Sequence, residues 1–233
     1  MKDLKIILDS MRRALESENV TLVGGDFKVM NRGHIDKIVI TTSCLGIVEK
    51  EKLLTIRRVR EGDKLIVTGP IGEHGATILA LQSGITPENI PFKSDLAPLT
   101  KAIEASLKIE GVHKARDLTR GGLSMALNDI ATSNGLTVIV YEDKIPVRKD
   151  VREFSEMLGV NVYDLACEGT ALLAVEDKNA EDVIEELKKV GYEDASIIGE
   201  VRKGKPGYVL LKTMTGGFRL LEPPSGEIVP RIC

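Results

Sequence analysis

Apolar residues at the start of the chain recur with the spacing of an amphipathic helix. They occupy one stripe of a 3.6-residue repeat, which predicts a helix over residues 4–17. The stripe consists of Leu4, Ile7, Met11, Ala14 and Leu15. Two runs rich in β-branched residues follow, VTLVGG at 20–25 and DKIVITTSCLGIV at 36–48, and their composition predicts two strands.

After Lys50 short apolar runs alternate with segments of helical periodicity. This alternation is typical of an α/β or α+β fold in which helices are layered on a sheet. One helix is expected to open with Ser94 and Asp95 as its cap and Pro98 in its first turn. Strands are predicted over residues 64–70, 136–141, 171–175, 196–201 and 208–212, and helices over residues 71–84, 94–111, 123–135, 151–159 and 179–191.

A domain boundary is expected near residue 50. The first fifty residues supply one helix and two strands, which are too few to enclose a hydrophobic core. We interpret residues 1–50 as the back part of a domain whose front is absent or is completed by another chain. Residues 51–225 are expected to fold independently and residues 226–233 to form an extended tail.

Composition narrows the classes of function. The 233 residues are 42% hydrophobic and carry a formal net charge of −3. The chain has no Trp, only 3% aromatic residues and no basic stripe, which argues against a nucleic-acid binder. No apolar run approaches the ~20 residues that span a bilayer. The N-terminus is rich in acidic residues and has no small-residue cleavage site, so we expect a cytoplasmic protein.

Cysteine and histidine positions do not form the pattern of a metal site. Cys44, Cys167 and Cys233 are an odd number at wide spacing, which is not a disulfide framework. No CxxC pair or Cys/His cluster suggests zinc. We interpret the three scattered histidines as surface or satisfied core residues rather than ligands, and Cys167 as a small buried residue.

Cys233 is the last residue of the chain, an unusual place for a thiol. A terminal residue packs poorly, and its thiol is easily oxidised. The last eleven residues, PPSGEIVPRIC, include three prolines that favour an extended arm, which could reach into a cleft and out to a second protein. PRIC is not a lipidation signal, because that requires Cys four residues from the end. An incidental cysteine on a disordered tail is the alternative.

The motif GGDFK has the residue types of a phosphate site. Gly24 and Gly25 allow the backbone to approach a ligand. The Asp26 carboxylate can hold Mg²⁺, and the Lys28 ammonium can meet a phosphate. A simple turn between two strands is the alternative, and spacing alone favours it.

The motif RDLTRGGL comes just before a predicted helix. Gly121 and Gly122 would leave backbone N–H groups bare at the helix N-terminus, which attracts anions. Thr119 and Arg120 add donors, and Asp117 is a suitable oxygen ligand for Mg²⁺ bound to phosphate. The alternative is a capped helix start, in which Asp117 or Thr119 is the cap.

The motif LACEGT connects a helix to a strand. Glu168 sits beside Gly169 in a short connection, where its carboxylate could face a cleft. A surface glutamate in a turn is the alternative, and spacing alone favours it. We interpret the IGEHG turn at 71–75 as structural.

Taken together, these motifs resemble the HypE family, the hydrogenase maturation carbamoyl dehydratases of the AIR-synthase-related (PurM-like) superfamily. The terminal PRIC is specific to HypE, whereas the other motifs are shared in part with superfamily relatives. The resemblance implies a PurM-like C-terminal domain preceded by the back part of an N-terminal ATP-binding domain. The matching motifs are GGDFK, IGEHG, SDLAPL, RDLTRGGL, EDKIPV, ACEGT, IIGEV and PRIC, and they cover nearly the whole chain.

The resemblance implies a specific reaction. In this family the C-terminal cysteine receives a carbamoyl group from the partner HypF. ATP phosphorylates the carbamoyl oxygen, and loss of phosphate leaves a thiocyanate on the sulfur. The cyanide then passes to iron on the HypC–HypD complex during [NiFe]-hydrogenase assembly. The implied cofactors are ATP and Mg²⁺, and the implied full-length form is a homodimer.

The resemblance also implies roles for individual residues. Cys233 would carry the carbamoyl group, Glu168 would be the base, and Lys28 would stabilise the phosphate or the carbamoyl group. Asp117 and Asp26 would hold Mg²⁺. Residues expected to bind ATP are Gly24, Gly25, Asp26, Thr119, Arg120, Gly121 and Gly122.

Two departures from the family pattern leave other functions open. Cys167 stands where the family usually has Asn, which puts the setting of Glu168 in doubt. The front of the ATP-binding domain, which in the family carries further Asp residues and the strands of a dimer barrel, is missing from this sequence, so we interpret the chain as a fragment whose activity by itself is left open. The alternatives are a non-catalytic carrier or interaction module, and another ATP-dependent enzyme of the superfamily.

Overall fold

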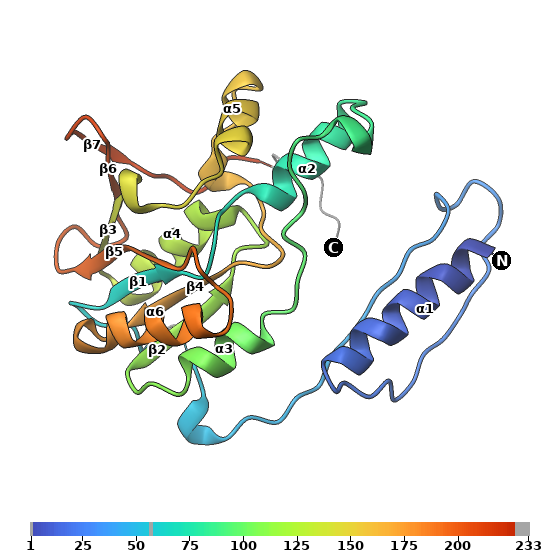
Figure 1. Cartoon of the computed structure of the whole chain (residues 1–233), viewed down its shortest axis with the longest axis horizontal. Coiled ribbons are helices and arrows are strands. Elements are labelled where there is room, and N and C mark those ends of the chain that lie inside the picture. The colour runs from blue at the N-terminus through green and yellow to red at the C-terminus, as the bar shows by residue number, and fades with distance from the viewer. Residues whose placement is uncertain (1, 56–57, 227–233) are drawn as a thin grey trace. The chain divides into compact units, whose positions relative to one another are not determined.

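The computed structural model describes residues 2–55 and 58–226. The chain divides into two compact units, Met1–Glu51 and Lys52–Cys233, which we call unit 1 and unit 2 (Figure 1). Each is described by itself. Among the described residues, no helix has both the length and the apolar character needed to cross a bilayer. The assignment of the units to the two superfamily domains, and of residues 226–233 to a tail, stays a prediction.

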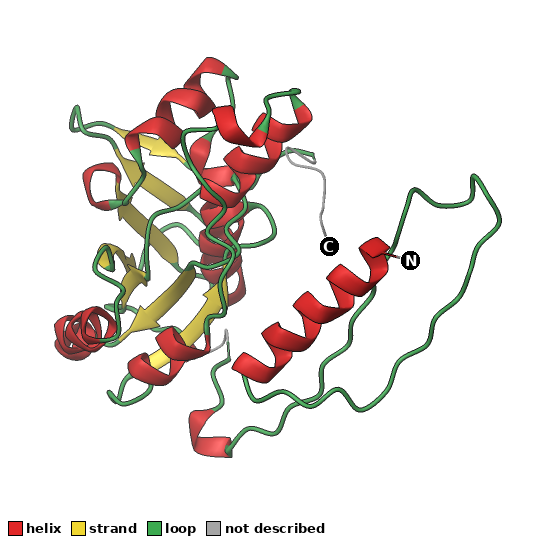
Figure 2. Ribbon diagram, turned by 45° about the vertical axis from the view of Figure 1, so that its right-hand side comes forward, coloured by secondary structure: helices red, strands yellow, loops and turns green. Residues whose placement is uncertain are grey.

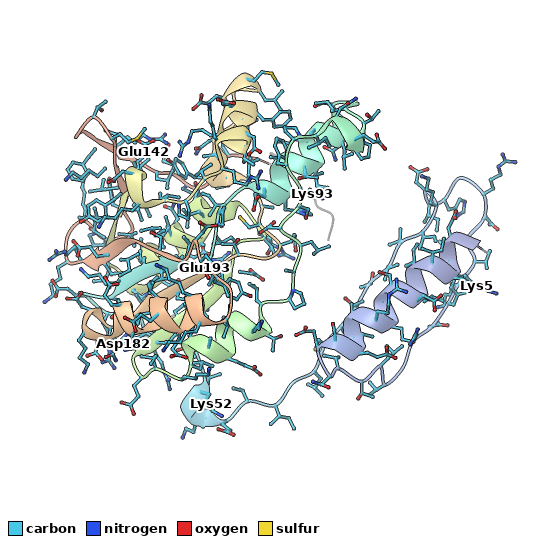
Figure 3. All side chains as sticks on the ribbon, viewed as in Figure 1. Lys5, Lys52, Lys93, Glu142, Asp182 and Glu193 are labelled. Atoms are coloured by element: carbon cyan, nitrogen blue, oxygen red, sulfur yellow. The ribbon has the colours of Figure 1, made fainter. Side chains whose placement is uncertain are left out.

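Unit 1 contains the predicted helix but neither predicted strand. Helix α1 (Lys2–Ser17) confirms the helical periodicity, and a short 3-10 helix, η1 (Lys50–Lys52), follows much later. The strands predicted at 20–25 and 36–48 are wrong, because this backbone is irregular. β-branched residues favour a strand only where the backbone pairs and one face is buried. Here they are exposed, and side chains project from one helix and its loops, as Figure 3 shows around Lys5.

Unit 2 is built on a mixed sheet of seven strands in the order β2-β4-β1-β5-β3-β6-β7. All neighbours are antiparallel except β3 and β6, which are parallel. The strands are β1 (Lys64–Val67), β2 (Val112–Asp117), β3 (Thr137–Tyr141), β4 (Ala171–Val175), β5 (Ser196–Arg202), β6 (Val209–Lys212) and β7 (Phe218–Leu220). Five of these confirm predicted strands, whereas β2 and β7 were not predicted.

Helices cover both faces of the sheet, as Figure 2 shows. Alternate residues of the strands point to opposite faces of the sheet and belong to two hydrophobic clusters. Val67 and Leu172 pack with α2, α4 and α5 on one face. Ile66 and Leu173 pack with α3 and α6 on the other face. This confirms a layered α+β fold. The helices are α2 (Glu73–Gln82), α3 (Thr100–Ser106), α4 (Gly122–Asn134), α5 (Lys149–Met157) and α6 (Ala180–Lys189), with 3-10 helices η3 (Pro87–Asn89), η4 (Glu142–Lys144), η5 (Val162–Asp164) and η6 (Asp177–Asn179).

One predicted helix boundary is wrong in an informative way. The helix expected over 94–111 spans only Thr100–Ser106, and Ser94 and Asp95 do not cap it. Their side chains instead bond to His74 and to the backbone at Glu168 and Gly169. A sequence that has the form of a helix cap therefore serves a long-range contact.

Candidate active site

Three loops converge on the connection between η5 and β4. The Gly75 N–H donates to the Ala166 carbonyl at 2.9 Å, and the Cys167 N–H donates to the Leu118 carbonyl at 3.1 Å. The Ala97 N–H lies 3.5 Å from the Glu168 carbonyl oxygen. The motifs IGEHG, SDLAPL, RDLTRGGL and ACEGT, distant in the sequence, therefore meet around Glu168.

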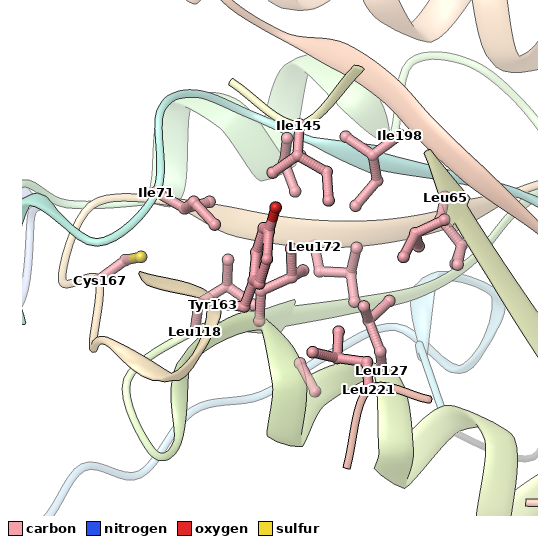
Figure 4. Packing of buried hydrophobic residues seen from close by; sticks show 14 of the residues in the cluster. Leu65, Ile71, Leu118, Leu127, Ile145, Tyr163, Cys167, Leu172, Ile198 and Leu221 are labelled. Atoms are coloured by element: carbon pink, nitrogen blue, oxygen red, sulfur yellow. The ribbon is translucent and has the colours of Figure 1, made fainter. Parts of the chain in front are cut away.

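Buried apolar residues anchor these loops to the core. Ile71, Leu118, Leu165 and Cys167 belong to one hydrophobic cluster, and each is almost completely buried. In Figure 4 Cys167 and Ile71 lie together at one side of that cluster, near Leu118. The polar neighbours of these anchors lie closer to solvent, since Asp117 is exposed and Glu168 is half-buried.

Asp95 is the main polar brace of the site. Its Oδ1 accepts the Glu168 N–H at 3.1 Å, and its Oδ2 accepts the Gly169 N–H at 2.9 Å. The Thr170 hydroxyl lies 3.0 Å from the Pro70 carbonyl oxygen and 3.2 Å from Asp95 Oδ2. Hydrogen bonds to an ionised carboxylate are the stronger kind. Asp95 therefore fixes the backbone on which the Glu168 side chain is mounted.

Two glycines of the motifs are required by close packing. A Cβ atom at Gly169 would lie 1.8 Å from the Asp95 carbonyl oxygen, so no side chain fits there. A Cβ atom at Gly122 would lie 2.5 Å from the Leu165 carbonyl oxygen, and the residue has a φ of 57°. These glycines let neighbouring backbone segments touch, which brings the RDLTRGGL loop against the Glu168 segment.

Glu168 is half-buried, and its carboxyl is close to other charges. Burial raises the pKa of this carboxyl above its usual range, the His74 imidazole opposes the shift, and the negative charges of Asp95 and Asp117 add to it. A carboxyl with a raised pKa holds a proton more strongly and is suited to take one from a substrate. Sequence spacing alone had favoured a surface turn for Glu168.

Cys167 is a buried acceptor of a hydrogen bond. Its Sγ lies 3.2 Å from the Gly72 nitrogen, so the N–H just before α2 points at the sulfur. Burial raises the pKa of the thiol, and the neighbouring charge of Asp95 adds to that shift. Cys167 therefore stays protonated and unreactive, in agreement with its interpretation as a small buried residue.

The helix that follows the RDLTRGGL loop begins without a side-chain cap. Helix α4 begins at Gly122 without any side-chain cap, while the Thr119 hydroxyl donates to Asp117 Oδ1 at 3.2 Å. The alternative of a side-chain cap is therefore wrong. Asp117 and Arg120 are exposed, but Gly122 is buried against η5. Within the described residues, no hydrogen bond uses the backbone N–H groups of Gly122 or Leu123.

The end of the described chain lies beside this loop. Pro224 Cγ lies 3.0 Å from the Cβ position of Gly121. Leu221 is buried, and its N–H donates to the Val209 carbonyl at 2.9 Å, which anchors the segment to β6. Cys233 itself lies outside the described residues.

The candidate residues of unit 1 are all exposed. Lys28 Nζ lies 3.6 Å from Asp26 Oδ2, and Asp26 Oδ1 accepts the Phe27 N–H at 2.8 Å. Gly24 and Gly25 have no neighbouring heavy atom within 4 Å of their Cβ positions. They belong to a different unit from Glu168 and Asp117, so a role shared with those residues stays a prediction.

The residues present fit Mg²⁺ bound together with a nucleotide. Across the described part of the chain, no three His, Cys, Asp or Glu side chains gather closely enough to hold a metal ion. Mg²⁺ usually takes one or two carboxylates and completes its shell with phosphate oxygens and water, so such a cage is not required. The exposed Asp117 carboxylate suits that arrangement.

Comparison with known proteins decides the family. Residues 60–212 match the family described as AIR synthase related protein, C-terminal domain. The carbamoyl dehydratase HypE of Escherichia coli K12 is 37% identical over 239 residues, which cover 100% of this chain and 69% of that protein. This chain belongs to the HypE family. The predicted family and the predicted AIR-synthase-related fold are confirmed.

Two solved HypE structures extend the comparison. A HypE crystallised in complex with ATP has a TM-score of 0.88 and 31% identity, covering 100% of this chain and 71% of that one. HypE in a HypE–HypF complex has a TM-score of 0.86 and 31% identity, covering 96% of this chain and 73% of that one. Curated members of the HypE family are named as enzymes, the carbamoyl dehydratases.

Sequence reasoning singled out Glu168 and Asp117 as candidates but did not identify Asp95, which braces the backbone at Glu168. Asp95 was assigned to a helix cap, and His74 to a structural turn. The available signal was the SDLAPL motif itself, since Pro98 follows Asp95 closely and disfavours a helix before it. Contacts of Asp95 with residues more than seventy positions away have no signature in a single sequence.

Proposed function

We propose that this chain carries out the ATP-dependent dehydration of an S-carbamoyl group on Cys233 to a thiocyanate. The carbamoyl oxygen attacks the γ-phosphorus of ATP and ADP leaves. The amide nitrogen then loses its protons, the C–O bond breaks, and phosphate departs with the former carbamoyl oxygen. The products are an S–C≡N group, ADP and phosphate, and the released protons go to a base and to solvent. The cyanide would supply a ligand of iron in [NiFe]-hydrogenase assembly.

The observation that carries this proposal is the environment of Glu168. Dehydration requires a base next to the amide nitrogen, and the base must be held in place. Glu168 stands on a backbone fixed by Asp95 at 3.1 Å and 2.9 Å, and burial raises the pKa of its carboxyl. This supports Glu168 as the group that removes the proton.

The start of the C-terminal segment supports Cys233 as the carrier. Pro224 lies against Gly121, at the loop that adjoins the Glu168 segment. The nine residues from 225 to 233 span at most about 30 Å when extended. A thiol on such an arm is within reach of the site and of a partner protein.

The remaining candidate residues take roles around the nucleotide. Asp117, with Asp26, would hold Mg²⁺, and the loop from Thr119 to Gly122, which leads into α4, would meet the phosphates. Lys28 would neutralise charge on the transferred phosphate, and Gly24 and Gly25 would let the backbone approach. A HypE relative crystallised with ATP supports nucleotide binding by this fold.

Partners and location follow from the same proposal. A HypE relative crystallised with HypF supports HypF as the carbamoyl donor. We further propose delivery of the cyanide to a HypC–HypD complex, a homodimer as the working assembly, and a cytoplasmic location.

Mass spectrometry of the C-terminal peptide tests the proposed function. The chain is incubated with HypF and a carbamoyl source, then with ATP and Mg²⁺. We expect carbamoylation of Cys233 followed by the loss of one water, and Cys233→Ala is expected to show neither change while keeping its fold. A carbamoyl group that never loses water, in a chain that binds ATP by calorimetry, would contradict dehydration. Absence of both ATP binding and dehydration would favour a carrier module.

A further inference from the structure

The C-terminal segment that leads to Cys233 is fixed to the core at Leu221. This residue is 2% exposed and belongs to the same hydrophobic cluster as Leu127 of α4, beside which it lies in Figure 4. The residues after it are less covered, since positions 222, 223, 225 and 226 are exposed and Pro224 is half-buried. Leu221 is therefore the last buried residue of the described chain.

Both backbone groups of Leu221 are hydrogen-bonded. Its N–H donates to the Val209 carbonyl at 2.9 Å, and its carbonyl accepts a hydrogen bond from Asn128 Nδ2 at 2.9 Å. Asn128 Nδ2 also donates to the Ser124 carbonyl at 2.8 Å. Both partners of this amide are carbonyl oxygens, so the nitrogen with its two protons must face them. One proton is used within α4 and the other reaches the C-terminal segment.

The needs of helix α4 do not explain Asn128. Asparagine is disfavoured in the middle of a helix, because its side chain competes for backbone hydrogen bonds. Asn134 on the same helix donates to the Ile130 carbonyl at 2.8 Å, and this bond lies within α4. The two asparagines share a bond to the carbonyl four residues back, whereas the bond to Leu221 belongs to Asn128.

The helix that holds Leu221 also carries the RDLTRGGL loop at its start. Asn128 lies six residues after Gly122, which is about 9 Å along the helix axis. Pro224 Cγ lies 3.0 Å from the Cβ position of Gly121, so the segment passes along this loop after Leu221. The twelve residues from 222 to 233 span at most about 40 Å when extended. The arm therefore starts close to the loop that adjoins the Glu168 segment.

We propose that Asn128 is a positioning residue, which together with the buried Leu221 anchors the C-terminal segment to α4 and fixes where the arm of Cys233 begins. This role rests on the proposed function. A tether that starts at a fixed point confines the carbamoyl group to a smaller volume and raises its local concentration at the site. Release of the anchor should slow dehydration, which takes place in the site, and leave the loading of Cys233 by HypF unchanged.

Hydrogen exchange of the Leu221 amide, followed by NMR, tests the anchor without any turnover. Asn128→Leu removes both side-chain donors, and we expect the Leu221 N–H to exchange about tenfold faster than in the unmodified chain. Asn134→Leu is the matched control, because it removes a bond within α4, and it should change this rate less than about twofold. Equal exchange rates in the two variants would overturn the proposal.

Single-turnover kinetics test the positioning role. Asn128→Leu is expected to slow dehydration of carbamoylated Cys233 about tenfold, while its carbamoylation by HypF changes less than about twofold. Leu221→Ala weakens the same anchor and should give a similar loss. The double variant should be less than about twofold slower than either single variant, because the two residues act as a unit. Losses that multiply in the double variant, or equal slowing of both steps by Asn128→Leu, would overturn the proposal.

The outcomes separate this proposal from the proposed function. If the unmodified chain forms no thiocyanate, the proposed function fails and the positioning role fails with it. If the unmodified chain forms thiocyanate and Asn128→Leu is as fast as Asn134→Leu, only the role of Asn128 is overturned. Should Asn128→Leu fail to fold, Asn128→Asp replaces it in both experiments, since it keeps the size of the side chain and removes the donors.

Discussion

Similar apolar sequences are exposed to solvent in unit 1 of this chain and buried in unit 2. In unit 1 Val23 is 96% exposed and Leu45 is 97% exposed, although both lie in β-branched or aliphatic runs. In unit 2 Leu65 and Leu172 lie in comparable runs, and neither side chain is more than 1% exposed. The difference is the presence of neighbouring strands, because each strand of unit 2 pairs with another and is covered by helices.

This contrast shows that a strand is a property of its surroundings as much as of its residues. The β propensity of Val and Ile reflects packing on a pleated, half-buried surface. Where unit 1 offers no such surface, the same residue types adopt irregular backbone. The proposed base lies in the unit that has the packed core, and this core gives Glu168 a rigid support.

Thiol reactivity should show the largest difference between the units. Cys44 is exposed, whereas Cys167 is buried, and burial raises the pKa of the Cys167 thiol. We expect a maleimide to label Cys44 in the native chain at least about a thousandfold faster than Cys167, which reacts only after local opening. Peptide mapping by mass spectrometry measures both rates in one sample. Comparable native rates would show that unit 2 is not packed as described.

Shortening a buried side chain in the core of unit 2 should give the next largest difference, in the free energy of unfolding. Leu127 is completely buried in the cluster between α4 and the sheet. We expect Leu127→Ala to lower the free energy of unfolding by about 2–5 kcal/mol. The matched change Leu22→Ala in unit 1, at a residue that is 71% exposed, should alter it by less than about 0.5 kcal/mol. Denaturation by urea measures both, and similar values would remove the contrast between the units.

Removal of the Asp95 carboxylate, which braces the backbone at Glu168, should lower the free energy of unfolding slightly less than Leu127→Ala does. Asp95→Ala leaves the Glu168 and Gly169 N–H groups without their carboxylate acceptor. We expect a loss of about 2–3 kcal/mol in unfolding free energy, measured by thermal denaturation. Asp26→Ala in unit 1 removes a bond to its neighbour Phe27 and an exposed ion pair with Lys28, so it serves as the control and should have almost no effect. If Asp95→Ala is as stable as this control, the brace does not hold the site.

A pH-dependent effect of about 1–2 kcal/mol is expected at Glu200. Its carboxylate lies 2.8 Å from Lys64 Nζ and 2.7 Å from Arg202 Nη2. Burial raises the pKa of Glu200, but the bonds to Lys64 and Arg202 outweigh this and leave the pKa below its usual value. Because the pKa is depressed on folding, the stabilisation is present above the unfolded value and is lost as the pH falls through the folded value.

The change Glu200→Gln tests this dependence. It should destabilise the chain at neutral pH, and the difference from the unmodified chain should disappear in acid, below the ordinary range of a glutamate pKa. Thermal unfolding from neutral pH into acid measures the difference. A difference that stays constant throughout this range would show that the ion pairs do not provide the stabilisation.

Much of unit 2 could be predicted because its elements are specified locally. The continuous apolar run at 171–175 and the helical stripe of 180–189 carry their own signal. Strand β2 was missed because HKAR within Val112–Asp117 is polar and lies at the edge of the sheet. The strands expected in unit 1 failed for the opposite reason, since their composition was suitable but the described residues of unit 1 contain no partner strand.

The candidate site could be predicted only in part. Glu168, Asp117 and the glycines stood out as residue types that suit catalysis and phosphate binding. The support of the Glu168 backbone by Asp95 depends on segments that meet only in the folded chain. The SDLAPL motif resembled a helix cap, because Ser and Asp accept N–H bonds in either setting.

The most direct test of the account is the fate of the carbamoyl group in the Glu168→Gln chain. The variant is carbamoylated by HypF, given ATP and Mg²⁺, and its C-terminal peptide is followed by mass spectrometry beside the unmodified chain. If Glu168 is the base, Cys233 of the variant keeps its carbamoyl group while the unmodified chain converts it to the nitrile. Formation of the nitrile by the variant at the unmodified rate would contradict the assignment of Glu168 as the base.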